Sequence, residues 1–239
     1  MTQSPENEKG FAGTAFKGAV FLTVLRWVVR IIGLISISIT ARKLTPEDFG
    51  VHSTAAIIVG LFTILQYSGT QEFLVKRDSV TDSVVNTSWT VRVGLTSVIA
   101  LCILAVSPFA PALLNEPRVF DVLLIYAFIP LVDALANPRM MLLLRNMEFG
   151  TLFKIRLIER LIAFVTLISA VLFFRSYWGI IIGYASSSVV FTLYTYLRWS
   201  YRPRFDTEHF KEVGGFACVA LVRSFSKYIC QTSDSVAAR

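Results

Sequence analysis

Charged residues, cysteines and histidines are all scarce in this sequence. Charged residues make up 16% of its 239 residues and hydrophobic residues 54%, whereas about 25% of the residues of a soluble domain are charged. The three cysteines, Cys102, Cys218 and Cys230, have neither the spacing of metal ligands nor that of a disulfide framework. The two histidines, His52 and His209, stand far apart in the chain. These shortages exclude an ordinary soluble domain, and we expect neither a metal site nor a cofactor.

The sequence also lacks the signatures of an enzyme. It has no Asp-x-Asp pair, no cluster of histidines, no nucleophile elbow and no loop long enough for a catalytic domain. Its net charge of +7 does not imply nucleic acid, because Lys and Arg collect in the cytoplasmic loops of membrane proteins. We therefore expect that the protein is not an enzyme and that it binds no nucleic acid.

Long apolar runs dominate the chain, and short connections separate them. Crossing the hydrocarbon core takes about 20 apolar residues, and backbone groups inside a bilayer must bond to one another, as they do in helices. The runs predict an all-α fold, a polytopic membrane helical bundle of about six transmembrane helices and an incomplete seventh. The expected spans are residues 16–41, 51–75, 86–110, 119–144, 157–175 and 178–199, followed by the less apolar stretch 212–235.

Lys and Arg are concentrated on one side of these spans. With the N-terminus in the cytoplasm, 14 of the 23 Lys and Arg residues lie on the cytoplasmic side and four lie outside. Cytoplasmic loops carry the excess of positive charge in membrane proteins. We therefore expect a cytoplasmic N-terminus, with the loops 42–50, 111–118 and 175–177 facing outward.

The last stretch of the chain is similar in sequence to the first. Residues 24–30 (VLRWVVR) align with residues 221–227 (LVRSFSK), and the same offset places residues 41–42 on residues 238–239. The copies lie in the first and the seventh expected spans, an even offset of six, so both run in the same direction, as in transporters built from two parallel repeats. This internal repeat predicts that a second bundle begins near the end of this chain.

The repeat and the spans together predict the organisation of the chain. We expect it to be the N-terminal part of a longer protein or a truncated product, with a missing C-terminal half as one partner. The expected parts are a disordered cytoplasmic tail at 1–13, an N-terminal six-helix bundle at 14–202, and a cytoplasmic linker with the truncated start of a second bundle at 203–239.

Several short segments, in order along the chain, are shared with one transporter family. They are ARKLTPEDFG at 41–50, LNEP at 114–117, LRNMEF at 144–149 and the basic loop YRP at 201–203. From about residue 14 to its end, the chain resembles the lipid-linked oligosaccharide flippases of bacterial polysaccharide synthesis, within the multidrug/oligosaccharidyl-lipid/polysaccharide (MOP) exporter superfamily. Members of this family look like two six-helix bundles, so the resemblance also implies a second bundle.

The resemblance implies a substrate, a location and partners. The substrate would be an oligosaccharide linked by a pyrophosphate to undecaprenol, moved across the bacterial cytoplasmic (inner) membrane for O-antigen, exopolysaccharide or capsule synthesis. Membrane lipid and the polysaccharide polymerase or glycosyltransferase machinery are the further partners that it implies. The lipid tail can stay in the bilayer during this movement, but the charged head has to cross through a hydrated cavity.

Four basic residues are candidates for lining that cavity. Arg26 and Arg30 lie four residues apart, hence on one face of the first helix, and Arg223 and Lys227 share this spacing in the repeat. Arginine forks match phosphate oxygens in bidentate fashion. We predict that these four residues bind the pyrophosphate between two bundles. The alternative for Arg26 is that its side chain reaches the inner membrane surface.

Asp133 is the one acidic residue near the middle of an expected span. Ionisable residues inside a membrane are costly and mark ion pairs or transport pathways. We consider Asp133 a candidate cavity residue, either as a counter-ion to Arg30 or as a protonatable coupling group. The alternative is a polar helix end that packs beside Asn137.

Three other functions remain open at this stage. One is a cation-coupled exporter of another substrate from the same superfamily, although such an exporter would need more acidic residues within the membrane. The second is a membrane enzyme such as a glycan polymerase or transferase. The third is a non-transporting, truncated membrane partner.

Overall fold

The computed structural model of the protein describes residues 5–66, 69–77 and 79–220, and within them every regular element is a helix. This confirms the expected all-α bundle. The labelled helices are α1 (Pro5–Ala41), α2 (Pro46–Gln66), α3 (Thr70–Lys76), α4 (Asp82–Val106), α5 (Ala110–Leu114), α6 (Val119–Ala134), α7 (Arg139–Arg145), α8 (Phe149–Phe174) and α9 (Tyr177–Arg198). A further helical segment covers residues 210–220.

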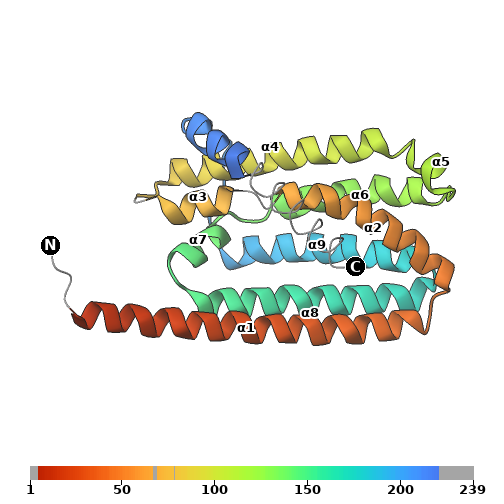
Figure 1. Ribbon diagram of the computed structural model, residues 1–239, viewed down its shortest axis with the longest axis horizontal. Coiled ribbons are helices and arrows are strands. Elements are labelled where there is room, and N and C mark those ends of the chain that lie inside the picture. Colours follow the sequence, from red (N-terminus) through yellow and green to blue (C-terminus); the bar gives the residue numbers. More distant parts are fainter. Residues whose placement is uncertain (1–4, 67–68, 78, 221–239) are drawn as a thin grey trace, which may run out of the picture.

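The long helices lie side by side, and their connections alternate between the two ends of the bundle (Figure 1). The turns from α1 to α2 and from α8 to α9 lie at one end together with α5, which we term the outer end. Helices α3 and α7 lie at the opposite, inner end. The three loops expected on one side of the membrane therefore meet at one end of the molecule.

Helix α1 extends beyond the bundle at the inner end (Figure 1). It begins at Pro5, so the helix reaches into the stretch 1–13 that the sequence marked as a disordered tail. Proline is well suited to the first turn of a helix, because its missing N–H would have no intrahelical partner there.

Four helices among the described residues are long and apolar enough to cross a membrane. They are Val20–Ala41, Asp82–Val106, Phe149–Phe174 and Tyr177–Arg198. The pair α6 and α7 makes a fifth span if the two are counted together, with a bend of 63° between them. The span expected over 119–144 is therefore divided in the structure.

Asn137 and Pro138 account for this break. Asn137 Nδ2 donates hydrogen bonds to the backbone oxygens of Trp199 (3.3 Å) and Tyr201 (2.9 Å). Its Oδ1 accepts a hydrogen bond from the Arg139 N–H at 3.1 Å. Proline disfavours helical backbone in the residue before it, so the helix does not continue through Asn137, and the backbone N–H of Asn137 donates instead to the Thr195 hydroxyl on α9 at 3.0 Å.

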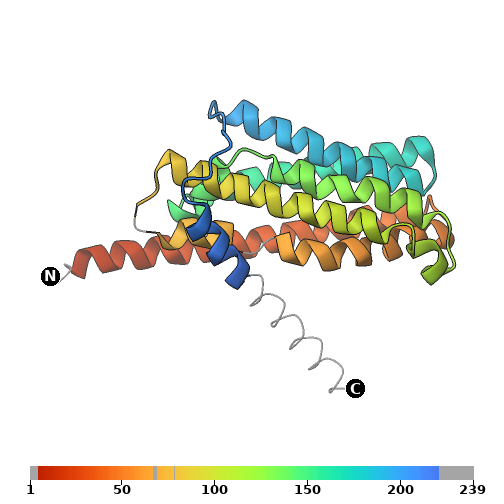
Figure 2. The ribbon, with the colours of Figure 1, turned by 90° about the horizontal axis from the view of Figure 1, so that it is seen from above.

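The expected span over 51–75 is also divided, between α2 and α3. Gly69 lies just before α3 with a φ of 87°, a backbone conformation that glycine adopts without steric cost. A Cβ at this position would lie 2.7 Å from the Cβ of Ala220 and 3.0 Å from the Cα of Ala217. The close approach of the segment 210–220 thus requires glycine where α3 begins, and Figure 2 shows this segment beside α3 and α4 at the inner end.

The segment that follows α9 is held against the first turns of α4 by hydrogen bonds. The Ser83 hydroxyl donates hydrogen bonds to the carboxylates of Asp206 (2.8 Å) and Glu208 (2.6 Å). The backbone N–H of Glu208 and the hydroxyl of Ser83 both donate to Asp206, and they hold the pKa of its carboxyl below the usual value. Arg77 pairs with Glu212 at 2.5 Å. The segment 201–212 is therefore an ordered strap at the inner end of the bundle.

The apolar core lies toward the outer end. It gathers the outer halves of α2, α4, α6 and α9, with Val51, Ile103, Val122, Leu123 and Ile181 all at most 2% exposed. Helix α9 lies against α8 through small residues, since a Cβ at Gly183 would come within 2.6 Å of the Leu167 Cα. The outer ends of these helices are therefore closely packed against one another.

Candidate functional site

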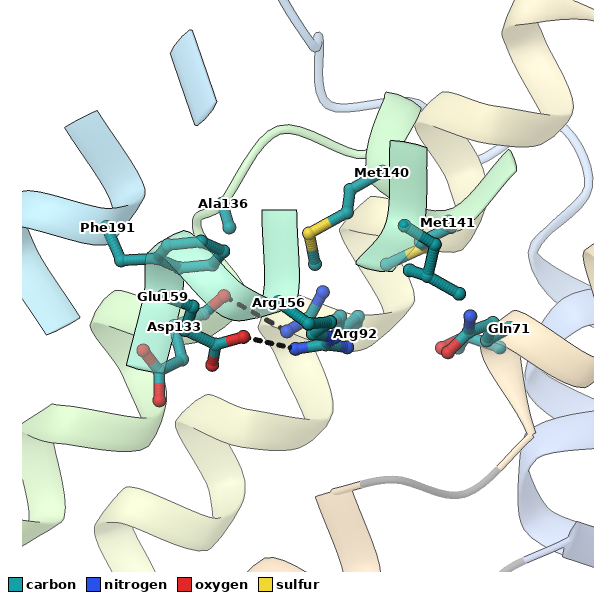
Figure 3. Close-up of a pocket in the computed structure, with 11 residues that line it drawn as sticks. Gln71, Arg92, Asp133, Ala136, Met140, Met141, Arg156, Glu159 and Phe191 are labelled. Atoms are coloured by element: carbon teal, nitrogen blue, oxygen red, sulfur yellow. Dashed lines mark hydrogen bonds and ion pairs between the residues drawn. The ribbon is translucent and has the colours of Figure 1, made fainter. Parts of the chain in front are cut away.

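Two cavities lie between the helices. The first cavity, of about 70 Å³, lies between α3, α4 and α6–α9 and carries both charges and apolar side chains (Figure 3). Its lining residues are Thr70, Gln71, Arg92, Asp133, Ala136, Met140, Met141, Leu152, Arg156, Glu159 and Phe191.

Charges of opposite sign compensate one another in the first cavity. Arg156 pairs with Glu159 at 2.8 Å, and an Arg92 Nη2 donates to the backbone oxygen of Asp133 at 3.0 Å. The Asp133 carboxylate accepts a hydrogen bond from the Ser188 hydroxyl. Figure 3 shows the side chains of Arg92, Arg156 and Glu159 turned toward one another, whereas the contact of Arg92 with Asp133 is made to the backbone oxygen and not to the carboxylate. The hydrogen bonds join α4 to α6 and α6 to α9, and the ion pair lies within α8; these contacts suit a structural role.

The second cavity is larger, at about 160 Å³, and lies between α1, α2, α8 and α9. Its lining is mostly apolar, with a few polar side chains and one arginine. The lining residues are Val29, Ile32, Gly33, Ser36, Ile37, Thr40, Phe49, His52, Arg160, Ala163, Phe164, Leu167, Ile180 and Tyr184.

Arg160 is the arginine of the second cavity, and it is exposed. Among the described residues no carboxylate forms an ion pair with it, in contrast to its neighbour on α8, Arg156. Arg160 lies 14 residues before the end of α8, hence about 21 Å below the outer end at a rise of 1.5 Å per residue. Its charge therefore remains available to an anion at the inner end of the cavity.

The arginines predicted on the first helix lie next to this cavity. Arg26 and Arg30 are both exposed, and Arg30 lies 6.0 Å from the ring centre of Trp27. They share one stripe of α1 with Gly33 and Ile37, which line the cavity. Both lie about 16 to 22 Å below the outer end of α1.

A ring contact sets the register of these three arginines. Phe21 of α1 and Phe153 of α8 have ring centres 5.7 Å apart, and the two helices lie side by side (Figure 1). Arg26, Arg30 and Arg160 are therefore level with one another along the bundle axis.

Polar aromatic residues occupy the part of the second cavity nearer the outer end. His52 Nδ1 lies 2.6 Å from the hydroxyl of Tyr126, and the ring of His52 stacks on that of Tyr184 with centres 5.8 Å apart. The cavity thus carries positive charge toward the inner end and ring faces with polar groups toward the outer end.

The structure separates the predicted site residues. Asp133 lies in the first cavity with Arg92 and Arg156, whereas Arg26 and Arg30 adjoin the second, so Asp133 is not beside Arg30. Arg223 and Lys227 fall outside the described residues. In the described part of the chain, no three His, Cys, Asp or Glu side chains gather as a metal site would need.

Sequence reasoning missed His52, Arg160 and Tyr184 as cavity residues. Their signal is weak, since none of the three belongs to a recognisable motif and each helix carries other polar residues. On a helix, the spacing of three residues favours a pairing of Glu159 with Arg156 over one with the adjacent Arg160. The structure shows the Arg156–Glu159 pair and places Arg160 in the lining of the second cavity.

The fold defines a polytopic helical membrane protein with polar cavities inside its bundle. A family model described as "Polysaccharide biosynthesis protein" matches residues 39–237. The match covers well over half of the chain, so the chain belongs to this family and has a role in polysaccharide biosynthesis. Comparisons with curated proteins and with solved structures gave no match.

Proposed function

We propose that the protein flips an undecaprenyl-pyrophosphate-linked oligosaccharide from the inner to the outer face of the bacterial cytoplasmic membrane. It does so as a transporter and makes or breaks no covalent bond. The family membership supports the biosynthetic context. The observation that carries the proposal is the second cavity, in which Arg160 lies level with Arg26 and Arg30 and has no acidic partner among the described residues.

The charge of the substrate explains why such a cavity is needed. An ion near the middle of a bilayer costs several kcal/mol or more unless it meets water or an opposite charge. Arginine remains charged under all ordinary conditions and offers a planar fork of donors to phosphate oxygens. Three arginines at one level would hold the pyrophosphate while the lipid tail stays in the bilayer.

A complementation experiment tests this proposal. Arg30→Ala and Arg160→Ala are introduced together into the gene in cells that lack the chromosomal copy, and surface polysaccharide is measured. We expect the double variant to lose polysaccharide and to accumulate lipid-linked saccharide on the cytoplasmic face. Arg30→Lys combined with Arg160→Lys should restore part of the activity, because the charge remains.

The control variant is Arg202→Ala, which removes an exposed arginine outside both cavities. Its polysaccharide level should equal that of the unmodified protein. Accumulation on the outer face would indicate a polymerase, since that step follows flipping. Normal polysaccharide in the double variant would refute the assignment of the cavity.

A further inference from the structure

His52 and Tyr184 form an aromatic wall in the second cavity. Both line the cavity, and Tyr184 is 41% exposed. Their rings are nearly parallel, at 12°, with centres 5.8 Å apart. The pair lies on α2 and α9, so stacked rings from two helices far apart in the sequence line the same space.

Neighbouring residues hold the His52–Tyr184 pair in place. Tyr126 is 5% exposed, and its hydroxyl lies 2.6 Å from His52 Nδ1. The two rings also meet edge to face, at 89°. Tyr184 follows Gly183, where α9 packs closely against α8. The aromatic surface is therefore formed before a ligand arrives, which lowers the entropy cost of binding.

The chemistry of this wall fits a sugar ring better than a lipid chain. The faces of a pyranose present C–H groups that pack on aromatic rings, and its hydroxyls require hydrogen-bonding partners. The imidazole of His52 and the hydroxyl of Tyr184 supply partners at the edges of the rings. An isoprenoid chain would gain nothing from these polar groups and would have to desolvate them.

We propose that the His52–Tyr184 pair is the docking platform for the saccharide ring that is bonded to the pyrophosphate. This inference rests on the proposed function, because it adds a sugar subsite to the same cavity. It makes Tyr184 a residue that determines specificity for a glycosylated lipid over the bare lipid pyrophosphate.

The positions along the bundle axis agree with this assignment. Tyr184 lies seven residues after the start of α9, and Arg160 lies 14 residues before the end of α8. Both of those ends are outer ends, so the two residues differ in depth by about 10 Å. The charge lies toward the inner end and the platform toward the outer end, so the sugar precedes the pyrophosphate on its way outward.

Binding to two lipids tests the platform. The protein in lipid nanodiscs is titrated with undecaprenyl pyrophosphate and, separately, with undecaprenyl-pyrophosphoryl-N-acetylglucosamine. We expect the unmodified protein to bind the glycosylated lipid more tightly. Tyr184→Leu keeps an apolar side chain but removes the ring, and it should weaken binding of the glycosylated lipid about tenfold without changing binding of undecaprenyl pyrophosphate.

Two further variants make the result specific. Tyr184→Phe keeps the ring and should retain most of the preference, which also guards against misfolding of Tyr184→Leu. Tyr196→Ala changes a tyrosine of the same helix that lines neither cavity and instead bonds the Leu135 carbonyl, and it should leave both affinities unchanged. Thermal unfolding of each variant shows whether the bundle is intact.

The outcomes separate the platform from the proposed function. Equal binding of both lipids by the unmodified protein, or equal loss of both in Tyr184→Leu, overturns the platform and leaves the flippase proposal standing. Failure of the unmodified protein to bind either lipid overturns the proposed function, and the platform with it. Arg160→Ala should weaken the binding of both lipids, because both carry the pyrophosphate.

Discussion

The two cavities differ in how their charges are balanced. In the first cavity, Arg156 has Glu159 as a partner and the Asp133 carboxylate has Ser188. In the second cavity, Arg160 has no acidic partner among the described residues. Both cavities belong to one bundle, and Arg156 and Arg160 lie only one turn apart on α8.

This difference distinguishes a structural role from a binding role. Ions removed from water need partners, and a compensated network connects the helices that supply them. A cation without a protein partner is costly in a membrane unless an external anion or water reaches it. We therefore assign the first cavity to the structure of the bundle and the second to the substrate.

The largest expected effect comes from reversing the charge in the second cavity. Arg160→Glu should lower flipping at least about tenfold, since one unfavourable contact of 1.4 kcal/mol has that effect and a carboxylate repels the pyrophosphate. The measurement is the cytoplasmic pool of lipid-linked saccharide, with protein abundance checked in parallel. An unchanged pool would contradict the assignment of the second cavity to the substrate and of the first to the structure of the bundle.

Breaking the ion pair of the first cavity should act on stability rather than on transport. Arg156→Ala leaves Glu159 without its partner and should lower the free energy of unfolding by about 1 kcal/mol, the range for partly exposed pairs. Adding Glu159→Ala should recover much of this loss. The free energy of unfolding of each variant is compared by thermal unfolding in detergent. A loss of stability in the double variant equal to the sum of the losses in the two single variants would contradict the pairing.

Asp133→Asn tests whether the first cavity also couples transport to protons. Asparagine can still accept the hydrogen bond from Ser188, so a structural role predicts unchanged flipping and an unchanged response to a pH gradient across the membrane. Flipping is measured at two opposite gradients. A flattened response in the variant would instead identify Asp133 as a coupling group.

The smallest effect is expected at an ion pair outside both cavities. Arg118 pairs with Glu116 at 2.8 Å in the outer loop and, mainly through a side-chain hydrogen bond, lowers the pKa of Glu116. A lowered pKa stabilises the folded protein at higher pH, and this contribution is lost as the pH falls through that pKa. Arg118→Ala should raise the pKa of Glu116 in an NMR titration and leave flipping unchanged.

The apolar runs determined the helical membrane fold and the grouping of the loops at two ends, because crossing a bilayer demands length and internal hydrogen bonds. Sequence also marked Arg26 and Arg30 through their spacing. Pro130 and Pro138 indicated a bend within the span 119–144, whereas the break at Gly69 was not apparent, since it depends on the approach of the segment 210–220.

The sequence by itself thus determined which segments form helices, in what order, and with which family the chain is grouped. Only the tertiary structure decided which polar groups meet: Arg92 and Asp133 are 41 residues apart, and Ser188 and Asp133 are 55 apart. Ion pairs and hydrogen bonds act over a few ångströms. Whether Arg160 faces a carboxylate or an open cavity therefore depends on how the helices pack and not on its neighbours in the chain.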